Sequence, residues 1–188
     1  MSRSLIKYIF GNRNNRAFTL TEILVASLIA LSLIGAVTSF YILSNRTYSV
    51  GVAKQWLQDS ANIILTKIID GKQEPGGVIR LCEAVSYNIV NISELHFTGI
   101  DGVERWFRLD NSSTNLIYHH PTASGTIDET IYSAPTGTTI TLRFSTPLGA
   151  QYTGVVVGID AALAKNVSGS AVSGSASTYV NIRNHSVQ

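Results

Sequence analysis

The sequence predicts an α+β fold in which one long N-terminal helix packs on a mostly antiparallel β-sheet. Three observations favour this fold. Residues 23–43 form an uncharged and largely apolar run, and residues 50–68 continue with apolar side chains at helical spacing. Further along the chain the pattern changes to alternation between apolar and polar residues, interrupted by turn-forming clusters. The length of 188 residues is enough for a single hydrophobic core.

The first 17 residues are basic, and the rest of the chain is not. They carry a charge of +4 with no acid, from Arg3, Lys7, Arg13 and Arg16. The remaining 171 residues hold ten Lys and Arg against twelve Asp and Glu. Because four cations precede the apolar run and only Arg46 follows it closely, the leader should stay in the cytoplasm and the rest should be exported. The sequence has no basic stripe with interleaved aromatic residues, so direct nucleic-acid binding is not expected.

The apolar run has the length of a membrane span. Its twenty-one residues, Ile23 to Leu43, would form a helix of about 31 Å, which matches a hydrocarbon core of about 30 Å. Small residues interrupt its apolar surface without charging it: Ser27, Ser32, Gly35, Thr38 and Ser39. Residues of this size allow helices to approach closely, so the run is suited to packing against other helices.

A single carboxylate, Glu22, stands at the start of this run. An unpaired charge in hydrocarbon costs several kcal/mol, so Glu22 needs a partner or a position at the membrane interface. A conventional signal peptide has a shorter apolar stretch, of about 7–15 residues, and is cut after it. A plain membrane anchor leaves Glu22 unexplained, unless its side chain merely reaches the interface. A cut between Ala17 and Phe18 would instead create an amine one helical turn before Glu22.

The stretch from Ala17 to Glu22 (Ala-Phe-Thr-Leu-Thr-Glu), with the apolar helix after it, resembles the leader and start of type IV pilins and type II secretion pseudopilins. This resemblance implies that a prepilin peptidase cuts between Ala17 and Phe18 and methylates the new amino terminus of Phe18. Glu22 then becomes the fifth residue of the mature chain and the residue of subunit assembly. The sequence departs from the family in having Ala17 where Gly is usual, and its leader is longer than in the commonest pilins.

The resemblance also implies an organisation and a set of partners. Residues 1–17 are the cleaved cytoplasmic leader, 18–44 the transmembrane and assembly helix, 45–71 its amphipathic continuation, and 72–188 an exported β-rich domain. The partners are a prepilin peptidase, other pilin or pseudopilin subunits and an inner-membrane assembly platform. The protein would cross the bacterial inner membrane once, with its C-terminal domain in the periplasm, before it enters a pilus or pseudopilus.

The order of elements resembles J-type pseudopilins and W-type minor pilins, and Arg183-Asn184 after the last predicted strand is similar to their ends. The expected function is therefore that of a minor structural subunit, and the presence of Glu22 argues against the tip-most pseudopilin. A membrane-tethered binding module that never polymerises, such as an adhesin or a substrate receptor, is the alternative.

The helix is expected from Phe18 to Asp70, and Gly71 and the run 75–77 (Pro-Gly-Gly) should end it. One apolar stripe in its second half should carry the exported domain: Val50, Ala53, Leu57, Ala61, Ile64 and Ile68.

The alternating runs predict strands within 94–98 and 103–109, joined by a turn at 99–102. Further strands are expected at 116–119, 138–145, 152–159 and 177–183. Residues 78–90 fit either a strand or a short helix. Loops are expected at 110–137 and 160–176, and the Gly- and Ser-rich part, 168–175, is predicted to be flexible.

No catalytic residue, metal site or cofactor is predicted. His119 and His120 are adjacent, so on a strand they would point to opposite faces. Asp128-Glu129 lacks the repeated Asp/Asn spacing of calcium loops and is interpreted as a solvated acidic turn. Cys82 is the only cysteine, which excludes an intramolecular disulfide.

Overall fold

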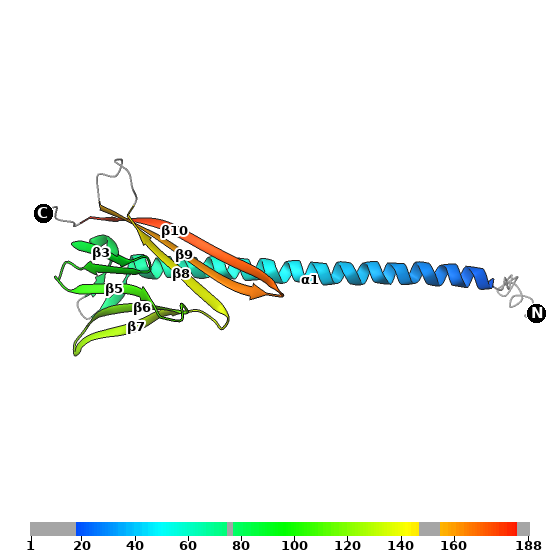
Figure 1. Cartoon of the computed structure of the whole chain (residues 1–188), viewed down its shortest axis with the longest axis horizontal. Helices are drawn as coiled ribbons and strands as arrows, with labels where there is room; N and C mark the ends of the chain where they lie inside the picture. The colour runs from blue at the N-terminus through cyan, green and yellow to red at the C-terminus, as the bar shows by residue number, and fades with distance from the viewer. Residues whose placement is uncertain (1–17, 75–76, 147–154, 184–188) are drawn as a thin grey trace, which may run out of the picture. The chain divides into compact units, whose positions relative to one another are not determined.

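The computed structural model describes residues 18–74, 77–146 and 155–183 (Figure 1). It has one long helix, α1 (Leu20–Asp70), of 51 residues. The chain divides into a first compact unit that ends at Asn45 and a second that begins at Arg46. The helix ends at Gly71, as predicted, where φ is +69°. A Cβ at Gly71 would lie 2.1 Å from the carbonyl oxygen of Ile79, so both the backbone conformation and the available space require glycine.

The strands of the second unit form antiparallel sheets, which confirms the predicted α+β fold. A five-stranded sheet has its strands in chain order: β3 (Ser86–Asn91), β4 (Glu94–Thr98), β5 (Glu104–Leu109), β6 (Asn115–Thr122) and β7 (Gly125–Ser133). A three-stranded sheet has the order β10-β9-β8, from β8 (Thr138–Ser145), β9 (Val155–Val167) and β10 (Ser170–Ile182). A short pair, β1 (Lys72–Glu74) and β2 (Gly77–Ile79), and a 3₁₀ helix, η2 (Leu81–Glu83), connect α1 to β3.

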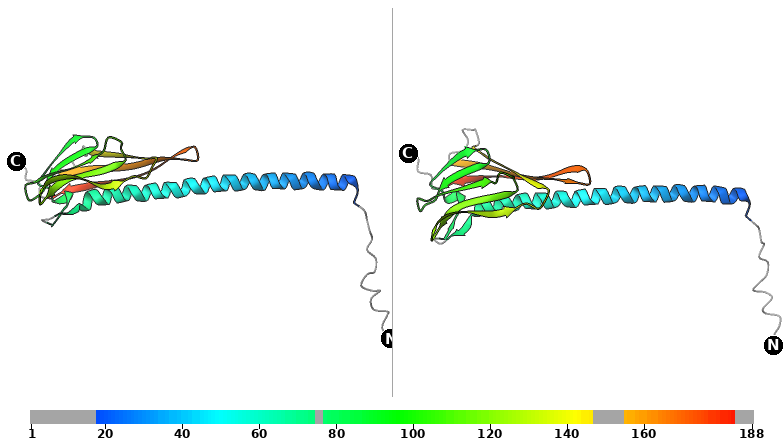
Figure 2. Two further views of the ribbon diagram at one scale, coloured as in Figure 1. Left: turned by 90° about the horizontal axis from the view of Figure 1, so that it is seen from below. Right: turned by 60° about the horizontal axis from the view of Figure 1, so that its bottom comes forward.

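The second part of α1 packs on the sheets through the predicted stripe. Leu57, Ala61, Ile64 and Ile68 are fully buried, and Val50 and Ala53 pack against the same core at its edge. Figure 2 shows this part of the helix lying against one face of the strands. Apolar side chains from both sheets complete the core, among them Phe97, Phe107 and Leu142. The apolar stripe, which repeats at the helical period, therefore determines which face of α1 packs against the sheets.

Strand β10 lies directly against the backbone of the helix. A Cβ at Gly174 would lie 2.4 Å from the backbone nitrogen of Gln58 and 2.6 Å from the carbonyl carbon of Leu57. The side-chain amide of Gln58 bonds to both backbone groups of Ser175: it donates to the carbonyl oxygen and accepts from the N–H at 3.2 Å. Gln58 thus occupies the free edge of β10 at this point, which blocks pairing with another strand there.

The loops expected at 110–137 and 160–176 are mostly strands, so that prediction is wrong. Strands β6 and β7 form a hairpin within the first range, and β9 and β10 fill most of the second. The Ser- and Gly-rich run 168–175 was expected to be flexible, but it belongs to β10 after a two-residue turn. In that turn φ is 52° at Ser168 and 77° at Gly169, the positive pair of a type I′ hairpin.

Other strand predictions are confirmed or extended. The hairpin at 94–98 and 103–109 is present as β4 and β5. Residues 78–90, which fitted either a strand or a short helix, contain the end of β2, η2 and most of β3. The strand expected at 152–159 is the start of β9, although residues 152–154 lie outside the described part of the chain, as do Pro75 and Gly76.

Candidate functional site

The start of α1 is closed by a reciprocal pair of side-chain contacts between Thr19 and Glu22. The backbone N–H and the hydroxyl of Thr19 both donate to Oε2 of Glu22, each at 2.9 Å. In return, the N–H of Glu22 donates to Oγ1 of Thr19 at 3.2 Å. This is a capping box, which satisfies backbone N–H groups that the first turn of a helix otherwise leaves without partners. The spacing Thr-x-x-Glu in the sequence is typical of a capping box and could have predicted this cap.

The predicted processing site lies just before this box. Ala17 lies outside the described residues, and Phe18 is 78% exposed. In the uncut chain the nitrogen of Phe18 is an amide and carries no charge. Phe18 and Glu22 are four residues apart at the start of the helix, a spacing that brings side chains to one face. Both bonds that Thr19 donates to Glu22 go to Oε2, and within the described residues Oε1 accepts none.

The apolar part of the helix, Ile23 to Leu43, exposes all its large side chains. Its four Ser and Thr hydroxyl groups are satisfied within the helix, because each donates to a backbone carbonyl three or four residues earlier. Ser27 donates to Leu24, Ser32 to Ile29, Thr38 to Ile34 and Ser39 to Gly35, at 2.8–2.9 Å. Side chains bonded in this way can enter lipid without losing a water partner. The helix is long and apolar enough to span a membrane.

The adjacent histidines lie on opposite faces of β6, as expected. His119 stacks on Trp106 with ring centroids 3.4 Å apart and contacts Asp128 through Nδ1 at 2.7 Å. His120 is buried on the inner face, where Nε2 lies 3.1 Å from Oε2 of Glu129. Within the described residues no group of three or more His, Cys, Asp or Glu side chains could hold a metal ion.

The acidic pair Asp128-Glu129 lies in strand β7, so the expected turn is wrong. Arg108 donates to Asp128 at 2.8 Å, and Lys72 donates to Glu129. Arg108, followed by His119, lowers the pKa of Asp128, and the hydrogen bond from Lys72 lowers that of Glu129. Both carboxylates are therefore ionised and engaged in ion pairs.

On the outer face of the five-stranded sheet, His96 lies between two carboxylates. Its Nε2 is 2.9 Å from Glu94 and its Nδ1 is 2.9 Å from Glu104. A carboxylate only accepts hydrogen bonds, so both contacts require an imidazolium that donates from both nitrogens. Partial burial lowers the pKa of His96, but the two glutamates outweigh it and raise the pKa above its ordinary value.

A buried ionic network was not found from the sequence. Arg105 is 1% exposed and donates from Nε and Nη2 to Glu74, and from Nη1 and Nη2 to Asp101, at 2.6–3.1 Å. A further bond from Nη1 to the carbonyl of Val103 occupies its last donor. The hydroxyl of Tyr118 donates to Glu74 at 2.7 Å. Because side chains alternate between the two faces of β5, Arg105 lies on the same face as Phe107. This alternation in the sequence could have indicated that Arg105 is buried.

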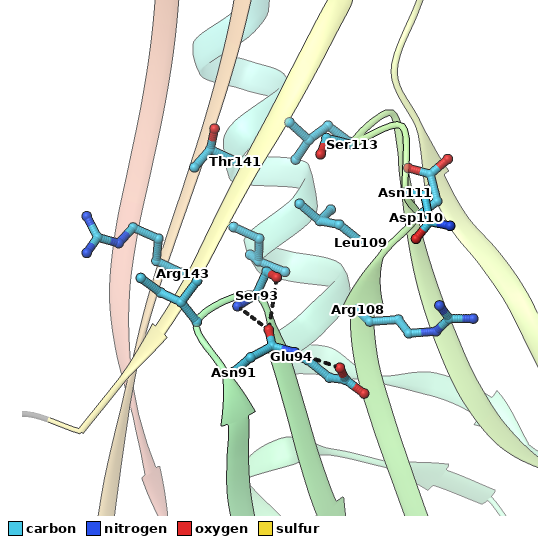
Figure 3. A pocket seen from close by; sticks show the side chains of 13 residues that line it. Asn91, Ser93, Glu94, Arg108, Leu109, Asp110, Asn111, Ser113, Thr141 and Arg143 are labelled. Carbon is cyan, nitrogen blue, oxygen red and sulfur yellow. Dashed lines mark hydrogen bonds between the residues drawn. The ribbon is translucent and has the colours of Figure 1, made fainter.

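A groove of about 630 Å³ lies between β8 and the turns that follow β3 and β5. It is lined mainly by polar residues, including Asn91, Glu94 and Asn111. Figure 3 shows that the guanidinium groups of Arg108 and Arg143 point to opposite sides of the groove. The labelled side chains therefore present no converging set of charges that could hold one ligand or assist a reaction.

Comparisons with protein-family models, with curated proteins and with solved structures gave no match for this chain.

Proposed function

We propose that this chain is a minor pilin-like structural subunit that is cut between Ala17 and Phe18, methylated on Phe18, and assembled through its N-terminal helix. The observation that carries the proposal is the single carboxylate at the start of an exposed apolar helix. Glu22 lies four residues after Phe18, and no other acid occurs before Asp59. The peptidase and the sibling subunits are the partners that this arrangement requires.

Cleavage would change the chemistry of Phe18. The amide nitrogen becomes an ammonium or a methylated ammonium, which needs an anion if it enters a low-dielectric environment. Glu22 offers Oε1, while Oε2 remains bonded to Thr19. Within one subunit the amine and Glu22 can interact across one helical turn. Between subunits, Glu22 can receive the amine of a neighbour, and such a buried pair fixes the stagger of two helices more than it adds stability.

The exported unit would supply the lateral contacts of the assembly, and a separate cytoplasmic ATPase would supply the work. The proposed location is the inner membrane, with residues 1–17 in the cytoplasm and the sheets in the periplasm, followed by a type IV pilus or a type II secretion pseudopilus. The uncharged run between Ile23 and Leu43 supports a membrane-inserted stage before assembly. The basic leader supports the orientation.

One observation favours a second function, a membrane-tethered binding module that does not polymerise. The capping box gives Glu22 a role inside its own helix, so its presence does not by itself require a neighbouring subunit. The two functions differ in what they need from Glu22. Capping needs a hydrogen-bond acceptor, whereas pairing with an amine needs the negative charge.

The replacement Glu22→Gln separates these needs, because Gln can serve in a capping box but has no charge. Glu22→Ala removes both properties. Asp59→Asn is the matched control, since it removes the next carboxylate of the same helix. The measurement is the fraction of each variant that is recovered in sheared filaments or cross-linked to sibling subunits.

Assembly predicts that Glu22→Gln and Glu22→Ala both leave the filament fraction, while Asp59→Asn remains in it. If Glu22→Gln assembles like the unmodified protein and only Glu22→Ala fails, capping is the role of Glu22 and pairing with an amine is excluded. If all variants behave alike and none is found in filaments, the tethered module is the better account.

A further inference from the structure

The tip of the β9–β10 hairpin reaches the start of the second unit of the chain. Arg46 donates from Nη2 to Oγ of Ser170 at 3.2 Å, immediately after the turn at Ser168-Gly169. Further along, Gly174 contacts Leu57 and Gln58, so the first residues of β10 run beside α1 (Figure 1). The hairpin tip therefore lies beside Arg46.

Arg46 is close to the end of the apolar run. It follows Leu43 by three positions, so their Cα atoms can be at most about 11 Å apart whatever the local conformation. When residues 23–43 span a bilayer, Arg46 must lie in or near the headgroup layer. The hydrogen bond to Ser170 brings the hairpin tip to the same level.

The chain segments next to Arg46 and the hairpin tip carry charges of one sign. Residues 44–55 of the helix and 163–173 of the hairpin contain Arg46, Lys54 and Lys165 and no Asp or Glu. The adjoining segment at the start of β8, residues 134–141, has no charged residue. Cations near an anionic membrane surface are attracted to it, and no carboxylate in these segments opposes that attraction.

Aromatic side chains flank the same level. Tyr41 and Tyr48 are both exposed on α1, before and after the end of the apolar run. Tyrosine is enriched at the boundary between hydrocarbon and water, where its ring and its hydroxyl find different surroundings. Their positions agree with a membrane boundary near Arg46.

We infer that the β9–β10 tip, with Arg46 and Lys165, forms a surface that binds the headgroups of anionic phospholipids while the helix is in the membrane. The inference rests on the membrane insertion of residues 23–43 proposed above. The guanidinium of Arg46 and the ammonium of Lys165 would contact lipid phosphates, and Ser168, Gly169 and Ser170 would lie among the headgroups. This contact would hold the exported unit against the membrane before assembly and would have to break when the helix leaves the bilayer.

The test uses the full chain in vesicles, with one fluorophore on a cysteine in a Cys82→Ser background. Ser168→Cys places the label at the hairpin tip. Ser124→Cys places it in the β6–β7 turn, next to Ala123, which shares a pocket with Glu74 and Ile79 beyond the far end of α1. Ser32→Cys places it in the apolar run. Quenchers attached to lipid headgroups report contact with the surface, and quenchers on acyl chains report insertion.

In vesicles that contain phosphatidylglycerol, the label at 168 should be quenched from the headgroups several-fold more than the label at 124. If the two are quenched equally while the label at 32 is quenched from the acyl chains, the lipid contact is refuted and the insertion stands. If the label at 32 is not quenched from the acyl chains, the insertion itself fails, and the inference fails with it.

Charge variants test the recognition chemistry. In some molecules the hairpin tip contacts the headgroups, and in the others it does not. Arg46→Gln and Lys165→Gln should each lower the ratio of the first population to the second about fivefold. Arg80→Gln is the matched control, because Arg80 lies beside Gly71 at the far end of α1 and should change nothing. Vesicles of phosphatidylcholine alone should reduce quenching at 168 as the two variants do. The inference is refuted if quenching at 168 in the charge variants, or in neutral vesicles, stays as strong as in the unmodified protein with phosphatidylglycerol.

Discussion

Thr19 donates two hydrogen bonds to one carboxylate oxygen of Glu22 and receives one from the backbone of the same residue. These contacts place Glu22 at the first turn of the helix, and its second oxygen accepts no hydrogen bond from residues 18–74, 77–146 or 155–183. An amine at Phe18 and the carboxylate would then have a defined spacing before any second subunit arrives. The capping box and the proposed pairing are compatible, because they use different oxygens of Glu22.

Replacement of Thr19 by Val should loosen the first turn of α1. The variant loses the hydroxyl that bonds to Glu22, and loss of such a cap costs about 1 kcal/mol. Amide hydrogens of Leu20 to Ile23 should therefore exchange roughly five times faster, as measured by hydrogen exchange on the protein in vesicles. Thr19→Ser keeps the hydroxyl and should exchange like the unmodified protein. Identical exchange in Thr19→Val would show that the box contributes nothing to the turn.

Gly174→Ala should destabilise the exported unit. The added methyl would meet the backbone of Leu57 and Gln58 at less than 3 Å, and backbone cannot move aside as a flexible side chain can. Overpacking of this kind costs about 1–3 kcal/mol. Gly51→Ala is the matched control, since nothing lies within 4 Å of that position in the helix. It should raise stability slightly, because alanine favours helix. Thermal unfolding followed by circular dichroism would give both values, and equal Tm values would contradict the packing.

Arg105→Met should be more destabilising than the double replacement Arg105→Met with Glu74→Met. The single change leaves the buried carboxylate of Glu74 facing an apolar side chain in place of the guanidinium, with Tyr118 still donating to it. Breaking a buried pair in this way costs about 3–5 kcal/mol. The double change removes both charges. Unfolding in urea measures the difference. A double variant that is less stable than the single one would mean that the attraction within the pair, and not the loss of the guanidinium beside a buried carboxylate, dominates.

His96 should make the stability of the chain depend on pH near neutrality. Its pKa is raised in the folded state, so the folded protein holds this proton more tightly than the unfolded chain does. The stabilisation is therefore complete below the unfolded pKa of about 6.5 and is lost as the pH rises through the higher folded value. The difference in Tm between the unmodified protein and His96→Gln should shrink from pH 6 to pH 8. A difference that stays constant or grows would contradict the paired imidazolium.

The helix could be predicted because its signals are local. The stripe that includes Leu57 and Ile68 follows the helical period, and Gly71 marks the end. The same holds for the β4–β5 hairpin, whose turn lies between two alternating runs. The start of α1 was expected at Phe18 but lies at Leu20, because Thr19 caps the first turn through Glu22. This capping role was not predicted, although the spacing from Thr19 to Glu22 is equally local.

The sheet details depend on distant contacts and could not be predicted in the same way. Ser and Gly in 168–175 are typical of a flexible loop, but here small residues are needed because β10 lies directly on the backbone of α1 at Gly174. Likewise, Arg105 finds Glu74 at a separation of 31 residues. The separation of Arg105 and Glu74 along the chain does not indicate that the fold brings them into contact.

The most direct test of the proposed function is the mass of the N-terminal peptide of the native chain, isolated from membranes of cells that have an active prepilin peptidase. The proposal predicts a chain that begins at Phe18 and carries a methyl group on its amino terminus. Recovery of the chain with residues 1–17 still attached would contradict it, because the nitrogen of Phe18 would then be an uncharged amide and could not pair with Glu22.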